Sequence, residues 1–302
     1  DLQQLCCNDI KKDPGKTTYT QMLNSKGGIV ADLTVTCINE KFFRIITGSS
    51  VREHDKKHIK ENLSKNTTII DVTEDLVCLG IFGPKSRQLL TDVFGEYFSP
   101  NDFKFGTAKE IKFNKNNIIF QRLSFVGELG WEIYIPINVS RDVYLELVKY
   151  GKNYDLVHAG GHALDIMRME KGFLHWGHDI SPAENPYEAG LDFTVKINKK
   201  INFIGKEALK QKNKKKKKQL TNFVLDNSKP GAPLLLHDEP IYYNNKIIGE
   251  TTSSNYSFCY ERNMVYGYID SEIDLKNLNG GKFEVEVAKN KYKINVITKP
   301  LH

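Results

Sequence analysis

Alternating apolar and polar residues open the chain. Two such runs, at 17–23 and 29–38, flank the segment NSKGG at 24–28, and a glycine pair between alternating runs predicts a β-hairpin. A third short strand is predicted at 42–47, and the charged segment at 51–63 has the apolar spacing of a surface helix.

The middle of the chain continues with both kinds of element. The apolar run LVCLGIF predicts a buried strand at 76–82, and the segment GPKSRQLLTDVFG after it predicts a helix, with Pro84 at its start and Gly95 just past its end. Ser140 is the predicted N-cap of a later helix. We predict two further strands and two further helices, at 118–125, 131–136, 140–150 and 161–171.

The pattern changes after a lysine-rich run at 210–218. Strand-length segments recur between polar turns and no helix is predicted, which is typical of a small sandwich or barrel. The six segments are 220–225, 240–243, 246–252, 264–269, 282–288 and 292–298. We therefore predict a first domain at 1–209, a linker at 210–218 and a β-domain at 219–302.

Length and composition are those of a globular protein. At 302 residues, with 40% hydrophobic, the chain can bury a core and is long enough for more than one domain. No run of about 18 apolar residues predicts a membrane span, and the N-terminus carries no pattern of a signal peptide. We expect no membrane partner.

The charge distribution and the cysteines indicate which partners and which cellular compartment to expect. The net charge of +6 comes from the run at 210–218, where seven of nine residues are Lys, so the rest of the chain is close to neutral. No aromatic residues alternate with these lysines, which favours a solvated linker over a nucleic-acid site. The five cysteines include no CxxC pair, which indicates free thiols and a reduced compartment, such as the cytoplasm or the mitochondrial matrix.

Asp32 stands in the second arm of the predicted hairpin, where an apolar or β-branched residue is typical. It shares one strand face with Val30, Thr34 and Thr36. In one interpretation this face meets solvent. In the other interpretation, Asp32 points into a cavity. A carboxylate there can take a proton from a cationic centre, or it can stabilise that centre electrostatically.

Three further charged residues are candidates. Glu132 follows Trp131 in an otherwise apolar strand, where it is either an edge residue or a costly buried acid, and Glu128 lies in the preceding turn. Arg168 either forms a surface ion pair with Asp165 at i,i+3 spacing or clamps a planar polar ligand.

Other chemistries lack support in the sequence. His175 and His178, like the pair on the charged helix at 51–63, have no third ligand at a metal-binding spacing, so we predict no metal site. No cysteine has a neighbouring basic motif that indicates a nucleophile, and neither a G-x-G-x-x-G nor a P-loop motif occurs.

Four ordered motifs carry a resemblance. They are YTQMLNSKGGIVADLTVT, LSFVGELGWEIYIP, ALDIMRMEKGFLHWGHDISPAENPYEAGLDFTVK and NFIGKEAL, and PIYYNNKIIGETTSSNYSF follows near the C-terminus. Together they resemble the folate-binding aminomethyltransferase family, that is, the glycine-cleavage T-protein and its relatives. The match is closest to the C-terminal half of sarcosine and dimethylglycine dehydrogenases. The resemblance implies an α+β fold with mixed sheets and packed helices, followed by a small antiparallel β-barrel.

The resemblance also implies a function. A flavin domain in the same polypeptide would use FAD to oxidise an N-methyl amine, and the folate domain would pass the one-carbon unit to tetrahydrofolate. Asp32 matches the family's catalytic carboxylate, Glu132 the acid that pairs with the pterin edge, and Arg168 a ligand-contacting arginine. Phe125 stands where the T-protein tends to have a Tyr, which favours the sarcosine-dehydrogenase type.

Three further points concern the segments expected before residue 1, the member of the family and the lysine run. The flavin domain and the folate domain's first strand are expected to lie before residue 1. The alternatives are a non-catalytic relative, like the regulatory subunit of pyruvate dehydrogenase phosphatase, and a stand-alone glycine-cleavage aminomethyltransferase. The lysine run could attract the polyglutamate tail of folate.

Overall fold

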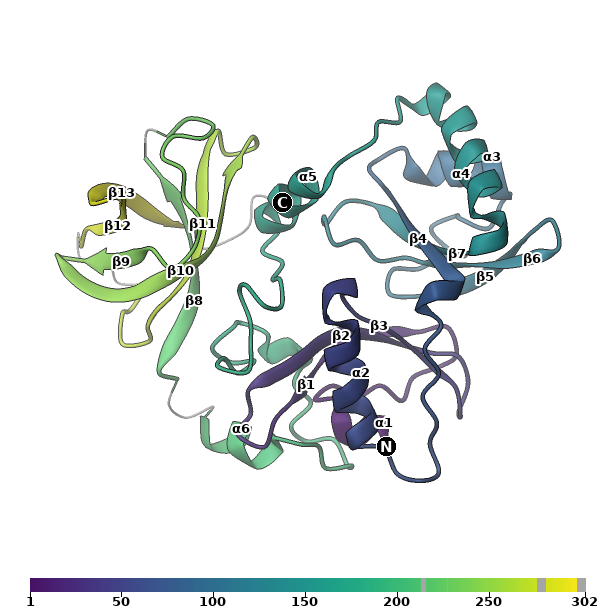
Figure 1. The fold of residues 1–302 in the computed structure, drawn as a ribbon, viewed down its shortest axis with the longest axis horizontal. Coiled ribbons are helices and arrows are strands. Elements are labelled where there is room, and N and C mark those ends of the chain that lie inside the picture. The colour runs from purple at the N-terminus through teal and green to yellow at the C-terminus, as the bar shows by residue number, and fades with distance from the viewer. Residues whose placement is uncertain (213–215, 227, 276–280, 298–302) are drawn as a thin grey trace. The chain divides into compact units, whose positions relative to one another are not determined.

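The computed structural model describes residues 1–212, 216–226, 228–275 and 281–297 (Figure 1). Contacts within the chain divide it into two compact units. The first unit comprises Asp1–Thr20 and Leu33–Gly160, and the second comprises Gln21–Asp32 and Gly161–His302.

The predicted hairpin is confirmed. Strands β1 (Thr17–Leu23), β2 (Ile29–Cys37) and β3 (Phe43–Ile46) form a sheet in the order β1-β2-β3. The glycine pair in the turn has two separate reasons. Gly27 has a φ of +81°, which a residue with a side chain rarely adopts, and a Cβ on Gly28 would overlap the carbonyl group of Pro182.

A four-stranded sheet forms the centre of the first unit. Every strand pair in it is antiparallel, and the order is β4-β7-β6-β5. The strands are β4 (Leu76–Phe82), β5 (Ala108–Phe113), β6 (Asn116–Gln121) and β7 (Gly130–Pro136). β5 is an edge strand in which three of the six residues are charged, and its pattern did not predict a strand.

Helices α3 (Ser86–Phe94) and α4 (Ile137–Gly151) cover one face of this sheet (Figure 1). The core between them includes Trp131, fully buried at the start of β7. The predicted cap at Ser140 is wrong. The helix begins at Ile137, and the Ser140 hydroxyl instead donates to the Ile137 carbonyl over 2.9 Å, within the first turn.

Short helical segments complete the first unit. The predicted surface helix is confirmed as α2 (Arg52–Glu61), which buries Ile59 and leaves most of its charged side chains at the surface. The remaining segments are α1 (Leu2–Leu5) and three 3-10 turns, η1 (Ser49–Val51), η2 (Thr73–Asp75) and η3 (Lys152–Tyr154).

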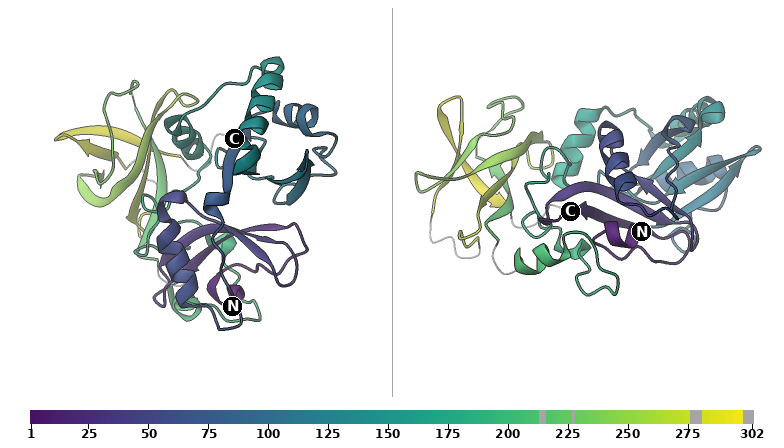
Figure 2. Two further views of the ribbon diagram at one scale, coloured as in Figure 1. Left: turned by 45° about the vertical axis from the view of Figure 1, so that its right-hand side comes forward. Right: turned by 60° about the horizontal axis from the view of Figure 1, so that its bottom comes forward.

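The second unit ends in a closed six-stranded barrel in the order β10-β11-β8-β13-β12-β9, seen from two sides in Figure 2. Each predicted C-terminal segment is confirmed as one of these strands, apart from residue 298 of the last segment, which lies outside the described residues. They are β8 (Lys218–Leu225), β9 (Pro240–Tyr243), β10 (Lys246–Ser257), β11 (Arg262–Asp270), β12 (Phe283–Val287) and β13 (Asn290–Ile297). The barrel encloses an apolar core that includes Phe223 and Val265. The predicted α+β class with a C-terminal antiparallel barrel is confirmed.

Three helical segments precede the barrel in the second unit, α5 (Gly161–Glu170), η4 (Asp192–Thr194) and α6 (Lys206–Lys212). The lysine-rich run begins inside α6. Its last member, Lys218, opens β8 and forms an ion pair with Glu184 over 2.5 Å. Residues 213–215 of the predicted linker lie outside the described residues, and the boundary at 210–218 stays a prediction. No helix in the described ranges is long and apolar enough to cross a membrane.

Candidate functional site

Asp32 lies in the middle of β2, on a face that is largely covered. Val30 and Thr36 on the same face are buried, and Asp32 itself is half-buried. The strand is therefore enclosed on both sides, and Asp32 is an acid in a mostly covered environment rather than one on a solvated face.

Asp32 accepts a hydrogen bond from Gln21, and Thr194 in turn contacts Gln21, all within the second unit. The Gln21 side-chain amide on β1 donates to Asp32 Oδ1 over 2.8 Å, and the Thr194 hydroxyl lies 2.5 Å from Gln21 Oε1. Gln21 and Thr194 are both fully buried. The NH₂ group of Gln21 therefore fixes the position of one carboxylate oxygen of Asp32.

Glu132 lies on the face of the four-stranded sheet that is opposite to the apolar core. Its neighbours in sequence, Trp131 and Ile133, point into that core, whereas Tyr134 shares the face of Glu132 at i,i+2 spacing. The Tyr134 hydroxyl donates to Glu132 Oε2 over 2.6 Å. Within the residues that the structure describes, no donor other than Tyr134 contacts the Glu132 carboxylate.

Burial shifts the ionisation of this pair. It raises the pKa of Glu132, and the hydrogen bond from Tyr134 opposes that shift. Burial, together with the nearby Glu132 charge, also raises the pKa of Tyr134, so its hydroxyl stays protonated and remains a donor.

A hydroxyl and amide network links β2 to this sheet within the first unit. Gln121 pairs directly with Glu132 across β6 and β7, and it is fully buried. The Thr36 hydroxyl donates to Gln121 Oε1 over 3.1 Å and lies 2.8 Å from the Thr17 hydroxyl. The network fixes the C-terminal half of β2 beside the strand that neighbours Glu132.

Phe125 and Glu128 lie in the connection between β6 and β7, and both are half-buried. The Ser124 side chain accepts a hydrogen bond from the Val126 backbone N–H over 3.2 Å, which shapes the connection next to Phe125. The structure thus assigns Phe125 and Glu132 to the first unit, and Asp32 and Arg168 to the second.

Arg168 is buried, with 1% of its surface exposed, rather than part of a surface ion pair. Its Nε donates to Asp165 Oδ1 over 2.7 Å, the predicted i,i+3 contact, and its Nη1 donates to Asp179 Oδ2 over 2.5 Å. Further bonds run to the Phe173 carbonyl and the Ser253 hydroxyl. These four contacts use four of the five N–H groups of a guanidinium, so at most one is left for a ligand.

Hydroxyl and amide groups of β10 complete the surroundings of Arg168. Thr252 donates to Asp179 over 2.7 Å, Asn255 donates to Asp165 over 2.8 Å, and Ser257 donates to Glu170 over 2.6 Å. The TTSSNYS segment of the sequence is therefore the surface on which α5 packs against the barrel.

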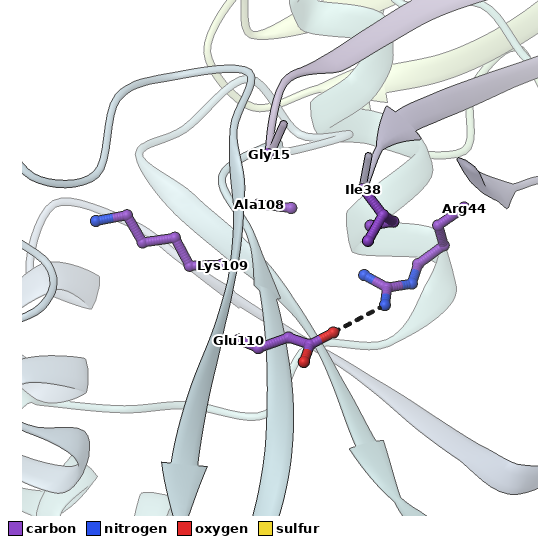
Figure 3. A pocket seen from close by; sticks show the side chains of 6 residues that line it. All are labelled: Gly15, Ile38, Arg44, Ala108, Lys109 and Glu110. Atoms are coloured by element: carbon purple, nitrogen blue, oxygen red, sulfur yellow. Dashed lines mark hydrogen bonds and ion pairs between the residues drawn. The ribbon is translucent and has the colours of Figure 1, made fainter. Parts of the chain in front are cut away.

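Neither the paired histidines nor a surface pocket of the first unit adds a site within the described residues. The rings of His175 and His178 lie 4.7 Å apart, and the described ranges contain no group of three or more His, Cys, Asp or Glu that could hold a metal. A shallow pocket in the first unit contains an ion pair of 3.2 Å between Arg44 and Glu110, with Lys109 pointing away from it (Figure 3). None of the predicted site residues lines this pocket.

Comparison with known proteins identifies the family. Residues 1–199 match the sequence model of the GCVT N-terminal domain, and residues 218–302 match that of the glycine cleavage T-protein C-terminal barrel domain. The chain belongs to the glycine-cleavage T-protein family.

Two relatives are dehydrogenases that are longer than this chain. The chain is 34% identical over 306 residues to mitochondrial dimethylglycine dehydrogenase of Rattus norvegicus, covering 99% of this chain and 35% of the relative. It is also 34% identical over 299 residues to mitochondrial sarcosine dehydrogenase of Homo sapiens, covering 93% of this chain and 32% of the relative. The chain thus spans about a third of the length of these proteins.

A solved structure agrees on the fold. The crystal structure of glycine cleavage system aminomethyltransferase T from Bartonella henselae superposes with a TM-score of 0.82 at 21% sequence identity, covering 99% of this chain and 80% of that one. The resemblance to the T-protein family and the predicted fold are both confirmed.

Proposed function

We propose that this chain transfers a one-carbon unit to tetrahydrofolate, as the folate-binding portion of an N-methyl amine dehydrogenase of the dimethylglycine or sarcosine type. The proposal is carried by two half-buried carboxylates, Asp32 of the second unit and Glu132 of the first, each of which accepts a hydrogen bond from a side chain of its own unit. Burying an acid is costly, so an acid that is buried and also held in one orientation is a candidate for function.

Glu132 is proposed to bind the pterin ring of tetrahydrofolate. The pterin edge offers N–H donors, and a carboxylate is an acceptor-only group with two oxygens. Tyr134 donates to one lone pair of Oε2, which positions that oxygen and leaves Oε1 and the second lone pair of Oε2 for the ligand. Phe125, in the connection before β7, is proposed to contact the same ligand through its apolar ring.

Asp32 is proposed as the catalytic residue. When formaldehyde condenses with tetrahydrofolate, two C–N bonds form and the two N–H hydrogens leave with the carbonyl oxygen as one water, which gives 5,10-methylenetetrahydrofolate. Positive charge develops on the attacking nitrogen, and a fixed carboxylate next to it stabilises that charge and orients the amine. The Gln21 amide supports this role because it holds one carboxylate oxygen of Asp32 in place.

Arg168 is proposed to act mainly by holding α5 against β10, with at most one N–H directed to a ligand. FAD would be bound by another portion of the full-length protein, which would also select the amine. A reduced, folate-containing compartment is proposed, and the mitochondrial matrix agrees with the names of the relatives.

The test is the rate at which the chain forms 5,10-methylenetetrahydrofolate from formaldehyde and tetrahydrofolate. We expect a rate well above that of the uncatalysed condensation. A folded chain that binds tetrahydrofolate without accelerating the condensation would instead support the non-catalytic alternative. Transfer only from an aminomethyl group on a lipoyl protein would support a stand-alone aminomethyltransferase.

A further inference from the structure

The ring of Phe82, the last residue of β4, covers two glycines on neighbouring strands. In the register of β4 and β7, Gly80 lies opposite Glu132, and Phe82 lies opposite Gly130. A Cβ on Gly80 would overlap Cε2 of the Phe82 ring and lie 2.7 Å from its Cζ, and a Cβ on Gly130 would overlap Cδ1. Because Cδ1 and Cε2 are opposite corners of the ring, the ring extends from one strand to the other.

This ring lies on the same sheet face as Glu132. Ile81, the residue before Phe82, points into the apolar core beneath α3 and α4, so Phe82 is on the opposite face, where it is half-buried. Gly80 has no side chain, so nothing on the directly opposite position of β4 separates the ring from the carboxylate.

A Cβ on Gly130 would also lie 2.5 Å from the Ile81 carbonyl oxygen, so the main chain as well as the ring excludes a side chain there. Glycine in a strand interior weakens the strand, and it often marks a place where a ligand or another backbone approaches closely. Here the absence of two Cβ atoms lets the Phe82 ring pack directly against the backbone of the sheet. The Glu132 carboxylate lies on the same face, which points away from the core.

We propose that Phe82 is a substrate-contacting residue whose ring packs on the planar pyrimidine part of the pterin, the same ring system whose N–H edge Glu132 is proposed to bind. The inference rests on the proposed function and deepens it, because it adds a contact to the face of the ligand. Aromatic stacking recognises the face of such a ring, and paired acceptor oxygens recognise its edge.

The test compares dissociation constants for 5-formyltetrahydrofolate, a reduced folate that is stable in air, among variants of the 302-residue chain. We expect Phe82→Leu to bind about fivefold to tenfold more weakly, because it keeps apolar volume and loses the aromatic face. We expect Phe82→Tyr to stay within about twofold, since it keeps that face. Phe113→Leu is the matched control, because Phe113 belongs to the same sheet but packs against the core, and its affinity should be unchanged.

Two results would overturn the inference, and they are distinguishable. If the unaltered chain is folded and binds no reduced folate, the inference and the proposed function both fail. The second result has three parts: the unaltered chain binds the reduced folate, Glu132→Gln abolishes that binding, and Phe82→Leu leaves it unchanged. In that case only the proposed role of Phe82 is wrong.

A reporter variant covers the case in which Phe82→Leu fails to fold. The Phe82→Trp variant places an indole at the proposed contact face. Its added fluorescence is the emission in excess of the unaltered chain, which has only Trp131 and Trp176. This added fluorescence should be quenched as 5-formyltetrahydrofolate saturates the site. Added emission that the ligand does not alter, after correction for ligand absorption, would contradict stacking at this position.

Discussion

The hydroxyl of Tyr134 donates a hydrogen bond of 2.6 Å to the carboxylate of Glu132 two residues earlier on the same strand. Both side chains rise from the sheet face that the apolar core does not occupy. The contact fixes one oxygen of a half-buried acid, and it limits how far burial raises the pKa of that acid. The geometry and the ionisation of Glu132 are therefore both coupled to Tyr134.

Removing this hydroxyl should move the pH dependence of folate binding. Burial already places the pKa of Glu132 above its usual value, so binding that needs the carboxylate is complete above that pKa and is lost as pH falls through it. Tyr134→Phe removes a hydrogen bond that lowers the pKa of Glu132. The pH below which folate binding is lost should therefore shift upward. Affinity at neutral pH should also fall, by about fivefold.

Calorimetric titrations between pH 5 and 8 would measure this shift. Tyr97→Phe is the control, because Tyr97 is 53% exposed and lies outside the proposed site. A Tyr134→Phe variant with the same acid limb as the unaltered chain would show that Glu132 does not bind as a carboxylate held by Tyr134.

Asp32→Asn should separate binding from transfer. The substitution keeps the shape of the side chain, and the Gln21 amide can still donate to the remaining carbonyl oxygen. Binding of tetrahydrofolate should stay within about threefold, whereas the rate of one-carbon transfer should fall by about 100-fold, because the stabilising charge is gone. Asp13→Asn, at an exposed position, is the control and should alter neither. Equal losses in affinity and rate would assign Asp32 to binding alone.

Arg168→Met should destabilise the second unit. The substitution leaves the buried Asp179 carboxylate without its charge partner, which typically costs about 3–5 kcal/mol. Denaturant unfolding would measure the loss, with Arg141→Met on the exposed side of α4 as the control. If the variant is as stable as the unaltered chain and only folate affinity falls, Arg168 acts as a ligand contact instead.

The Gly27-Gly28 turn should tolerate no added methyl at its second position. A Cβ on Gly28 would overlap the Pro182 carbonyl group, so Gly28→Ala should lower the free energy of unfolding by about 1–3 kcal/mol. Gly160→Ala provides the matched comparison, because a Cβ there meets nothing within 4 Å, and it should change stability by less than about 0.5 kcal/mol. Similar losses for the two variants would show that the contact with Pro182 is not what selects glycine.

Local sequence signals predicted much of the fold. β4 (Leu76–Phe82) and β9 (Pro240–Tyr243) have the predicted bounds, because each is a short apolar or aromatic run with turn residues beside it. β5 was missed because an edge strand carries charged residues that blunt its pairing edge, and those charges hide the strand pattern. The start of α4 was misplaced because Ser140 has the chemistry of a cap but lies inside the first turn.

The site was predictable only in part. Asp32 and Glu132 stand out as acids in apolar strands, and strand alternation alone could have added Tyr134, since residues two apart share a face. Gln21 and Thr194 could not be found in this way, because 173 positions separate them and only the tertiary fold brings them together. The burial of Arg168 likewise depends on Ser253 of the barrel, 85 positions away.

The most direct measurement is a calorimetric titration of tetrahydrofolate into the chain and into its Glu132→Gln variant, which keeps the shape of the side chain and removes its charge. The account predicts micromolar binding, about −8 kcal/mol, for the unaltered chain and a loss of that binding in the variant. Equal binding by the two proteins, or none by a chain shown to be folded, would contradict a folate site built on Glu132.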